Sequence, residues 1–157
     1  MKKILGVTVS TVVGATLAVG LAPQAEAATS IRVRALSIAA GQKNDPYVSG
    51  ATGPNAFDCS GLVKYSFGKV GKTLPRTAQQ QYNASKKLSW QSRTKGDIVA
   101  IGTSTGNIKH IGIYAGYWSG KAWMWNANSG SYRGRKVVLA PINEYLYSGR
   151  HAYYGRF

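Results

Sequence analysis

The chain has 157 residues, about the length of one domain, and its charge is strongly positive. It carries 20 Lys and Arg residues against 5 Asp and Glu residues, for a net charge of +15 at neutral pH, which excludes an acidic protein. A hydrophobic fraction of 44% excludes a disordered polybasic tail. The single cysteine excludes an intramolecular disulfide, and together with two histidines it is a poor set of ligands for structural zinc.

The N-terminus has the pattern of a secretory signal peptide. A basic start, Met1-Lys2-Lys3, precedes an uncharged apolar run over residues 4–22, and Ala25-Glu26-Ala27 has the small-x-small pattern of a cleavage site. A retained membrane anchor is the alternative, because about 20 apolar residues can span a bilayer. Glycine, serine and threonine dilute this run and favour the signal peptide. We therefore expect residues 1–27 to be removed, leaving one exported domain over residues 28–157 without stable membrane insertion.

The predicted elements change from helical to extended along that domain. The first half predicts three helices: one over residues 31–41, one from Asp58-Cys59 to Gly71, and one that Thr77 caps and that continues through AQQQYNASKK. From Asp97 on, glycine and asparagine turns separate short predicted strands at residues 98–101, 110–115, 122–126, 136–139 and 152–156. This layout predicts an α+β domain.

Cys59 lies between a glycine-rich loop and an apolar-faced helix. At a helix start, unpaired N–H groups and the helix dipole stabilise a thiolate and lower the pKa of a cysteine. We therefore expect a reactive nucleophile here, with an inert buried cysteine as the alternative. A free thiol in an exported protein is unusual and singles this residue out.

A thiolate nucleophile needs an imidazole to move protons, and that imidazole needs a third polar group to fix its tautomer. Only His110 and His151 can serve. Along the predicted strand, His110 lies on the face opposite Ile111 and Ile113, so its ring can leave the aliphatic core and meet the Cys59 helix. His110 is the candidate base, His151 is a second candidate, and an ordinary strand histidine is the alternative for His110.

The next predicted strand offers the third polar group. Asn126 and Asn128 share one face with Met124, and a carboxamide oxygen can accept a hydrogen bond from an imidazole N–H. We expect Asn126 to take this role, in a Cys59-His110-Asn126 arrangement. Asn128 is expected to belong to the turn NANSGS, and the alternative is that both asparagines merely begin that turn.

Tyr47 and four short runs stand out together: DCSGLV at residues 58–63, LPRT at 74–77, KGDIV at 95–99 and HIGIY at 110–114. In this order and spacing they resemble the NlpC family of cell-wall cysteine peptidases. The resemblance covers nearly the whole predicted domain, from about Ile31 to the C-terminus. The combination is far more specific than any one of its motifs.

The resemblance implies a papain-like fold, in which a helix with the nucleophile packs on an antiparallel sheet that carries the histidine and the third polar residue. It also implies endopeptidase action on peptidoglycan stem peptides, between γ-linked D-glutamate and the third-position diamino acid. Cys59 would be the nucleophile, His110 the general base and then the acid, and Asn126 the residue that orients it. The family usually has a second histidine where this chain has Asn126, which cannot carry charge.

The same resemblance suggests substrate-binding residues beside the nucleophile. Tyr47 corresponds to a family tyrosine whose hydroxyl lies close to the sulfur, and Asp58 and Ser60 would help form the pocket for the N-terminal side of the stem. For Asp58 the alternative is a helix-terminal carboxylate that only favours the dipole. The N–H of Cys59 is a natural oxyanion donor. Arg76 is expected to be solvated, with contact to the acidic stem as the alternative.

Two other functions fit these residues. One is an N-acetylmuramoyl-L-alanine amidase or lysin of similar fold, which also needs a thiolate. The other is a non-catalytic cationic wall-binding protein, against which the set of Cys59, His110 and Asn126 argues. No metal or organic cofactor is required by the sequence, and one domain without heptads suggests a monomer.

The basic surface favours polyanions as partners. Removal of Lys2, Lys3 and Glu26 with the signal peptide lowers the net charge by one, from +15 to +14. Export makes anionic cell-wall polymers the expected partner rather than nucleic acid, because no basic helix or arginine-rich arm stands out. A merely solubilising surface is the alternative.

Binding of residues 28–157 to purified wall sacculi should weaken as ionic strength rises, because salt screens attraction between exposed charges. Pull-down on sacculi at low and high salt measures this. The same bound fraction at both salt concentrations would contradict the electrostatic partner.

Overall fold

The computed structural model describes residues 23–131 and 133–157, with side chains from residue 31 on. Within this part, the helices are α1 (Pro23–Gly41), α2 (Cys59–Gly68) and α3 (Ala78–Ala84), with short 3-10 helices η1 (Trp90–Ser92) and η2 (Ile142–Tyr145). The strands are β1 (Lys86–Leu88), β2 (Ile98–Ser104), β3 (Asn107–Trp118), β4 (Lys121–Asn128), β5 (Lys136–Pro141) and β6 (His151–Arg156). The predicted α+β class is confirmed.

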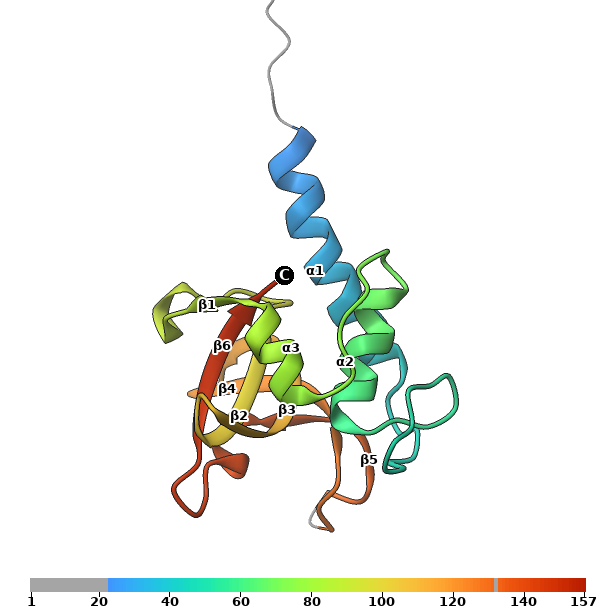
Figure 1. Ribbon diagram of the computed structural model, residues 1–157, viewed down its shortest axis with the longest axis vertical. Coiled ribbons are helices and arrows are strands. Elements are labelled where there is room, and N and C mark those ends of the chain that lie inside the picture. Colours follow the sequence, from blue (N-terminus) through green and yellow to red (C-terminus); the bar gives the residue numbers. More distant parts are fainter. Residues whose placement is uncertain (1–22, 132) are drawn as a thin grey trace, which may run out of the picture.

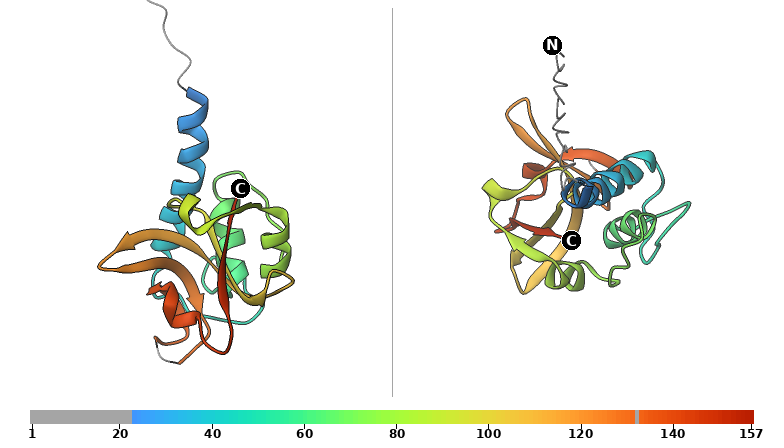
Figure 2. Two further views of the ribbon diagram at one scale, coloured as in Figure 1. Left: turned by 90° about the vertical axis from the view of Figure 1, so that its left-hand side faces the viewer. Right: turned by 90° about the horizontal axis from the view of Figure 1, so that it is seen from above.

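These strands form one sheet in the order β1-β6-β2-β3-β4-β5, and every neighbouring pair is antiparallel. The helices gather on one face of the sheet (Figure 1). Hairpin β3–β4 reaches away from them (Figure 2). The C-terminal strand β6 lies between β1 and β2, so the chain ends inside the sheet rather than at its edge.

Helix α1 is longer than the sequence predicted. It begins at Pro23 instead of near residue 31 and runs through the predicted cleavage site, and its N-terminal half projects beyond the other elements (Figures 1 and 2). Its C-terminal half joins the core through Ala35 and Ala39, which are fully buried. The predicted apolar segment over residues 4–22 lies outside the described residues. Among the described helices, none is long and apolar enough to cross a membrane.

The third helix ends earlier than predicted. Thr77 caps α3 as expected, in a reciprocal capping box with Gln80. The predicted continuation through SKK is wrong: α3 stops at Ala84, and Lys86 and Lys87 belong to β1 instead. Pairing with β6 satisfies the backbone of this segment in the sheet, and a local sequence pattern does not reveal such a long-range partner.

Two hydrophobic clusters lie on opposite faces of the sheet. The helix-side cluster joins α1, α2 and α3 to sheet residues that include Ile108, Ile111 and Ile113. The second cluster includes Tyr114 of β3 and Tyr145 of η2. Strand β3 therefore contributes side chains to both clusters, which is the alternation that a strand buried on both faces requires.

A β-bulge interrupts this alternation next to His110. Ile101 of β2 pairs with His110, but Gly102 pairs with Ile108, so Lys109 is the extra residue on β3. The bulge allows Ile108 and Ile111, three positions apart, to enter the same helix-side cluster. Glycine is required at position 102, because a Cβ there would lie 2.1 Å from the carbonyl oxygen of Asn107.

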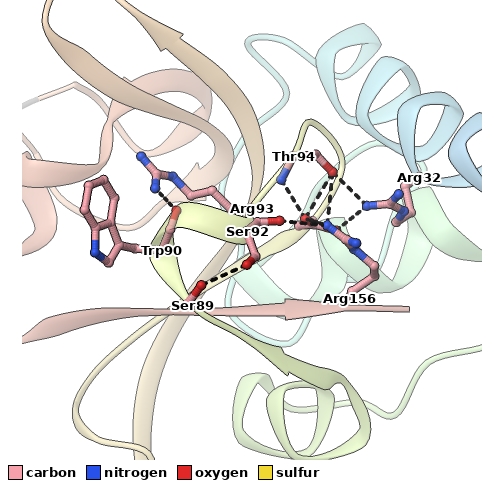
Figure 3. A network of polar contacts seen from close by, with 8 residues as sticks. Arg32, Ser89, Trp90, Ser92, Arg93, Thr94 and Arg156 are labelled. Atoms are coloured by element: carbon pink, nitrogen blue, oxygen red, sulfur yellow. Dashed lines mark hydrogen bonds and ion pairs between the residues drawn. The ribbon is translucent and has the colours of Figure 1, made fainter.

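An ion cluster centred on Asp97 ties the helix layer to the sheet. The Asp97 carboxylate is fully buried and accepts hydrogen bonds from Arg32 of α1, Arg156 of β6 and the N–H of Thr94. Figure 3 shows both arginines converging on one point beside Thr94. Gly96 lets α1 approach, since its φ is +89° and a Cβ there would lie 2.5 Å from the Arg32 backbone.

Replacing Asp97 by Asn should lower the free energy of unfolding by about 3–5 kcal/mol, because it leaves two arginines without their buried carboxylate. Burial raises the pKa of Asp97, but hydrogen bonds from Arg156, Thr94 and Arg32 lower it overall from 3.8. The charged carboxylate therefore stabilises the fold fully at pH values above its ordinary pKa of 3.8. This stabilisation is lost as the pH falls through the lowered pKa of the folded state. Urea unfolding of the Asp97→Asn variant at several pH values measures this loss of stability, with Asp45→Asn as the control. Equal effects of the two substitutions on the free energy of unfolding would contradict the prediction.

Candidate active site

Helix α2 begins at Cys59 because the preceding residue, Asp58, caps it. Asp58 has an extended backbone, and its Oδ1 accepts a hydrogen bond of 2.7 Å from the N–H of Gly61. Gly61 also permits close packing, because a Cβ there would lie 2.0 Å from the carbonyl oxygen of Ala51. The half-buried Cys59 side chain packs against the helix-side cluster.

The Cys59 sulfur lies next to strand β3. A backbone hydrogen bond from Ile111 reaches it and favours the thiolate, as do the N–H groups of Ser60 and Cys59 itself. The ladder between β3 and β4 runs from Ile113 with Trp125 toward the hairpin turn. The thiol therefore contacts β3 at Ile111, the residue after His110, outside the segment in which β3 pairs with β4.

The electrostatic prediction for Cys59 is wrong. Burial, and then the negative charge of Asp58, raise the pKa of the thiol above its ordinary value of 9.0 despite the N–H groups at the helix start. The helix terminus lowers the pKa as expected, but desolvation and the neighbouring carboxylate raise it by more. At neutral pH the resting sulfur is therefore protonated.

His110 and Asn126 are joined by a hydrogen bond between neighbouring strands. The Nε2 of His110 lies 3.0 Å from the Oδ1 of Asn126, while the Nδ2 of Asn126 donates to the carbonyl of Val138. That second bond assigns the asparagine oxygen to the histidine side, so Nε2 carries the proton and donates. The imidazole Nδ1 is left with a lone pair that can accept a proton.

The His110 ring is stacked on Tyr145 of η2, with ring centroids 4.9 Å apart and planes at 5°. It is 7% exposed. Burial lowers the pKa of His110 to about 4, the bond to Asn126 opposes this, and the charge of Arg150 adds to it. The ring therefore contacts Tyr145 of the second cluster, and in the resting protein it is neutral.

Asp58, Ser60 and Arg76 form one polar cluster near Cys59. Arg76 donates to both carboxylate oxygens of Asp58, and its Nη1 lies 2.8 Å from the Oγ of Ser60. The expectation that Arg76 is solvated is wrong, because the fork of its guanidinium matches the carboxylate. Burial raises the pKa of Asp58, but the bonds from Arg76 and Gly61 lower it overall, so its charge persists.

Tyr47 borders the same cluster. Its backbone bonds to Arg135 and bridges to Phe57, the residue before Asp58. Burial and the nearby Cys59 and Asp58 raise the pKa of its hydroxyl, while the Arg135 guanidinium lies 5.1 Å from its ring centroid and lowers it. Tyr47 is therefore within electrostatic range of the sulfur.

Two other candidates make different contacts. Asn128 donates to the carbonyls of Gly130 and Gly134 and so holds the turn, as expected for it. His151 is exposed at the start of β6 and makes an edge contact with Tyr153. Sequence reasoning missed Tyr145, because the run INEY contains no local signal that places a tyrosine against His110.

Titration of His110 followed by NMR should have its midpoint near pH 4, because burial disfavours the imidazolium. In the His151→Ala variant it is the only histidine, so the signal is assigned directly, and the Nε2–H tautomer is expected. In Asn126→Ala the midpoint should fall further, since the bond that favours the charged form is lost. A midpoint above pH 6 would contradict this environment.

Comparison with known proteins gives a consistent result. The NlpC/P60 family model matches residues 44–150. The bifunctional muramidase/DL-endopeptidase CwlT of Bacillus subtilis is 52% identical over 77 residues, which cover 47% of this chain and 23% of CwlT. The probable endopeptidase Cgl2188 of Corynebacterium glutamicum is 43% identical over 98 residues, which cover 61% of this chain and 46% of that protein.

The fold is shared as well. The solved structure of the peptidoglycan hydrolase RipB from Mycobacterium tuberculosis superimposes with a TM-score of 0.69 at 26% identity, covering 86% of this chain and 68% of RipB. The chain spans less than half of the length of the two curated relatives. The helices on an antiparallel sheet are those of the papain-like NlpC/P60 domain, and this chain belongs to the NlpC/P60 family.

Proposed function

We propose that this protein is a secreted cysteine endopeptidase that cleaves peptidoglycan stem peptides between γ-linked D-glutamate and the third-position diamino acid. The single observation that carries the proposal is the His110–Asn126 hydrogen bond on the strand whose next residue, Ile111, contacts the thiol at the start of α2. The relative CwlT, named a DL-endopeptidase, supports the substrate class. Anionic wall polymers are proposed as partners of the basic surface.

The first half of the reaction forms a thioester. The Nδ1 of His110 takes the Cys59 proton, and the sulfur attacks the γ-carbonyl carbon of D-glutamate. The N–H of Cys59, at the start of α2, donates to the developing oxyanion. The imidazolium then protonates the leaving amine as the C–N bond breaks. Asn126 keeps the ring in the tautomer that makes both transfers possible.

The second half releases the enzyme. His110, neutral again, takes a proton from water while the water oxygen attacks the thioester carbon, and the C–S bond breaks. The sulfur recovers its proton from the imidazolium. Asp58 and Tyr47 act electrostatically on the thiol or are acted on by it, and Ser60 belongs to the same cluster through Arg76. We assign these three residues to the N-terminal part of the stem.

The raised pKa of Cys59 and the lowered pKa of His110 make the resting pair neutral. Proton transfer between them therefore belongs to the reaction with substrate rather than to the resting state. An active site of this kind does not hold a thiolate exposed to oxidation between turnovers.

Mass spectrometry of muropeptides incubated with residues 28–157 tests the reaction. The expected product is a fragment that ends in L-Ala-γ-D-Glu, absent with Cys59→Ala. Removal of the general base in His110→Ala should reduce the rate by about 10²–10⁴-fold, whereas the matched control His151→Ala should leave it unchanged.

Other products would change the conclusion. Release of an intact stem peptide from the glycan would identify an amidase. Absence of cleavage, with sacculus binding by both the parent and Cys59→Ala, would identify a wall-binding protein.

A further inference from the structure

A basic pocket of about 390 Å³ adjoins His110 on the side of η2. Its charged lining residues are three bases and one acid: Lys109, Arg133, Glu144 and Arg150. Arg133 forms a two-pronged ion pair with Glu144, with N–O distances of 2.5 and 2.6 Å. The charges of Lys109 and Arg150 therefore remain in excess in the pocket.

Arg150 makes two contacts with Tyr147. Its Nη1 donates to the Tyr147 hydroxyl at 2.8 Å, and its guanidinium lies 4.5 Å from the centroid of the Tyr147 ring. Within the described part of the chain it forms no ion pair with a carboxylate. A guanidinium with unused donors suits a planar, bidentate anion such as a carboxylate.

The position of the pocket indicates which part of the substrate enters it. In the proposed reaction His110 protonates the leaving amine, so that nitrogen must come within hydrogen-bond distance of the ring. Asp58, Ser60 and Tyr47, which we assign to the acyl side, do not line this pocket. The residue that carries the leaving amine therefore lies on the His110 side, where the pocket opens.

We propose that this pocket, through Arg150, binds a carboxylate on the stem-peptide residue whose amine leaves, an inference that rests on the function proposed above. The carboxylate is either the side-chain group of a diamino acid such as meso-diaminopimelate or the main-chain group of a tripeptide stem. Both present the same anion to the guanidinium. A third-position residue without any carboxylate leaves the excess charge of the pocket unpaired.

Carboxylate binding also acts on the neighbouring base. The charge of Arg150 is one of the effects that disfavour protonated His110. A bound carboxylate offsets that charge, so the imidazolium that forms during the reaction is less costly when the correct leaving group is present. Arg150 thereby links recognition of the leaving residue to proton transfer by His110.

Arg150→Gln tests the inference, with Arg34→Gln on the exposed surface of α1 as the control for loss of one charge. The substrates are L-Ala-γ-D-Glu-X tripeptides, in which X is meso-diaminopimelate, its side-chain amide, L-lysine or L-lysinamide. Arg150→Gln should lower kcat/KM by about 10–100-fold for carboxylate-bearing X, the range of a lost charge-assisted hydrogen bond. Arg34→Gln should change none of the four.

The four substrates separate the two sources. A defect confined to meso-diaminopimelate assigns the side-chain carboxylate, and a defect that extends to the side-chain amide and L-lysine but spares L-lysinamide assigns the main-chain one. An equal defect on all four substrates, or none on any, would overturn the inference.

Binding to Cys59→Ala, measured by calorimetry, makes the test independent of turnover. A carboxylate preference that Arg150→Gln abolishes in this background supports the pocket even if the parent cleaves nothing, and in that case only the proposed function fails. Equal affinity for the meso-diaminopimelate and L-lysinamide peptides would overturn the inference even if the parent cleaves both.

Discussion

The alternation of side chains along β3 is the constraint on which the rest of the site depends. Both faces of β3 are buried, so its successive side chains must enter the helix-side cluster and the cluster around η2 alternately. The bulge at Lys109 shifts this alternation by one residue, so Ile108 joins Ile111 on the helix side. A one-residue change of register would exchange every side chain between the two faces, and it would remove His110 from both Asn126 and Tyr145.

The site joins two environments across this strand. On one side, the Asp58 carboxylate caps α2, pairs with Arg76 and keeps a negative charge beside the thiol. On the other side, His110 stacks on Tyr145, and the positive charge of Arg150 acts on it. Burial, and in addition these two charges, raises the pKa of the thiol and lowers the pKa of the imidazole, so both environments oppose an ion pair in the resting protein.

The same fields suit a substrate that carries charge of its own. A stem peptide has an amine at its L-alanine end and carboxylates further along. An amine near Asp58 and a carboxylate near Arg150 would each offset the local charge that opposes ionisation. In our proposal, the substrate therefore contributes part of the electrostatic stabilisation of the thiolate–imidazolium pair. This gives a physical reason for selectivity that shape alone would not provide.

The sequence by itself determined the features that depend on local order. The α+β class, the helix start near Asp58-Cys59, the cap at Thr77 and the strand with His110 follow from periodicity and capping chemistry, which act over a few residues. The preference for Asn126 over Asn128 came from turn chemistry, which the hydrogen bonds of Asn128 satisfy in the structure. The family motifs narrowed the candidate residues further.

Only the tertiary structure decided the features that depend on neighbours distant in sequence. Strand β1 exists because β6 pairs with it, and Arg76 is bound because Asp58 lies opposite, 18 positions earlier in the chain. The pKa of Cys59 has a direction that its helix position did not predict, because desolvation and a neighbouring carboxylate outweigh the helix dipole. Burial, long-range pairing and the stacking of Tyr145 on His110 arise when the chain closes on itself, and no local pattern encodes them.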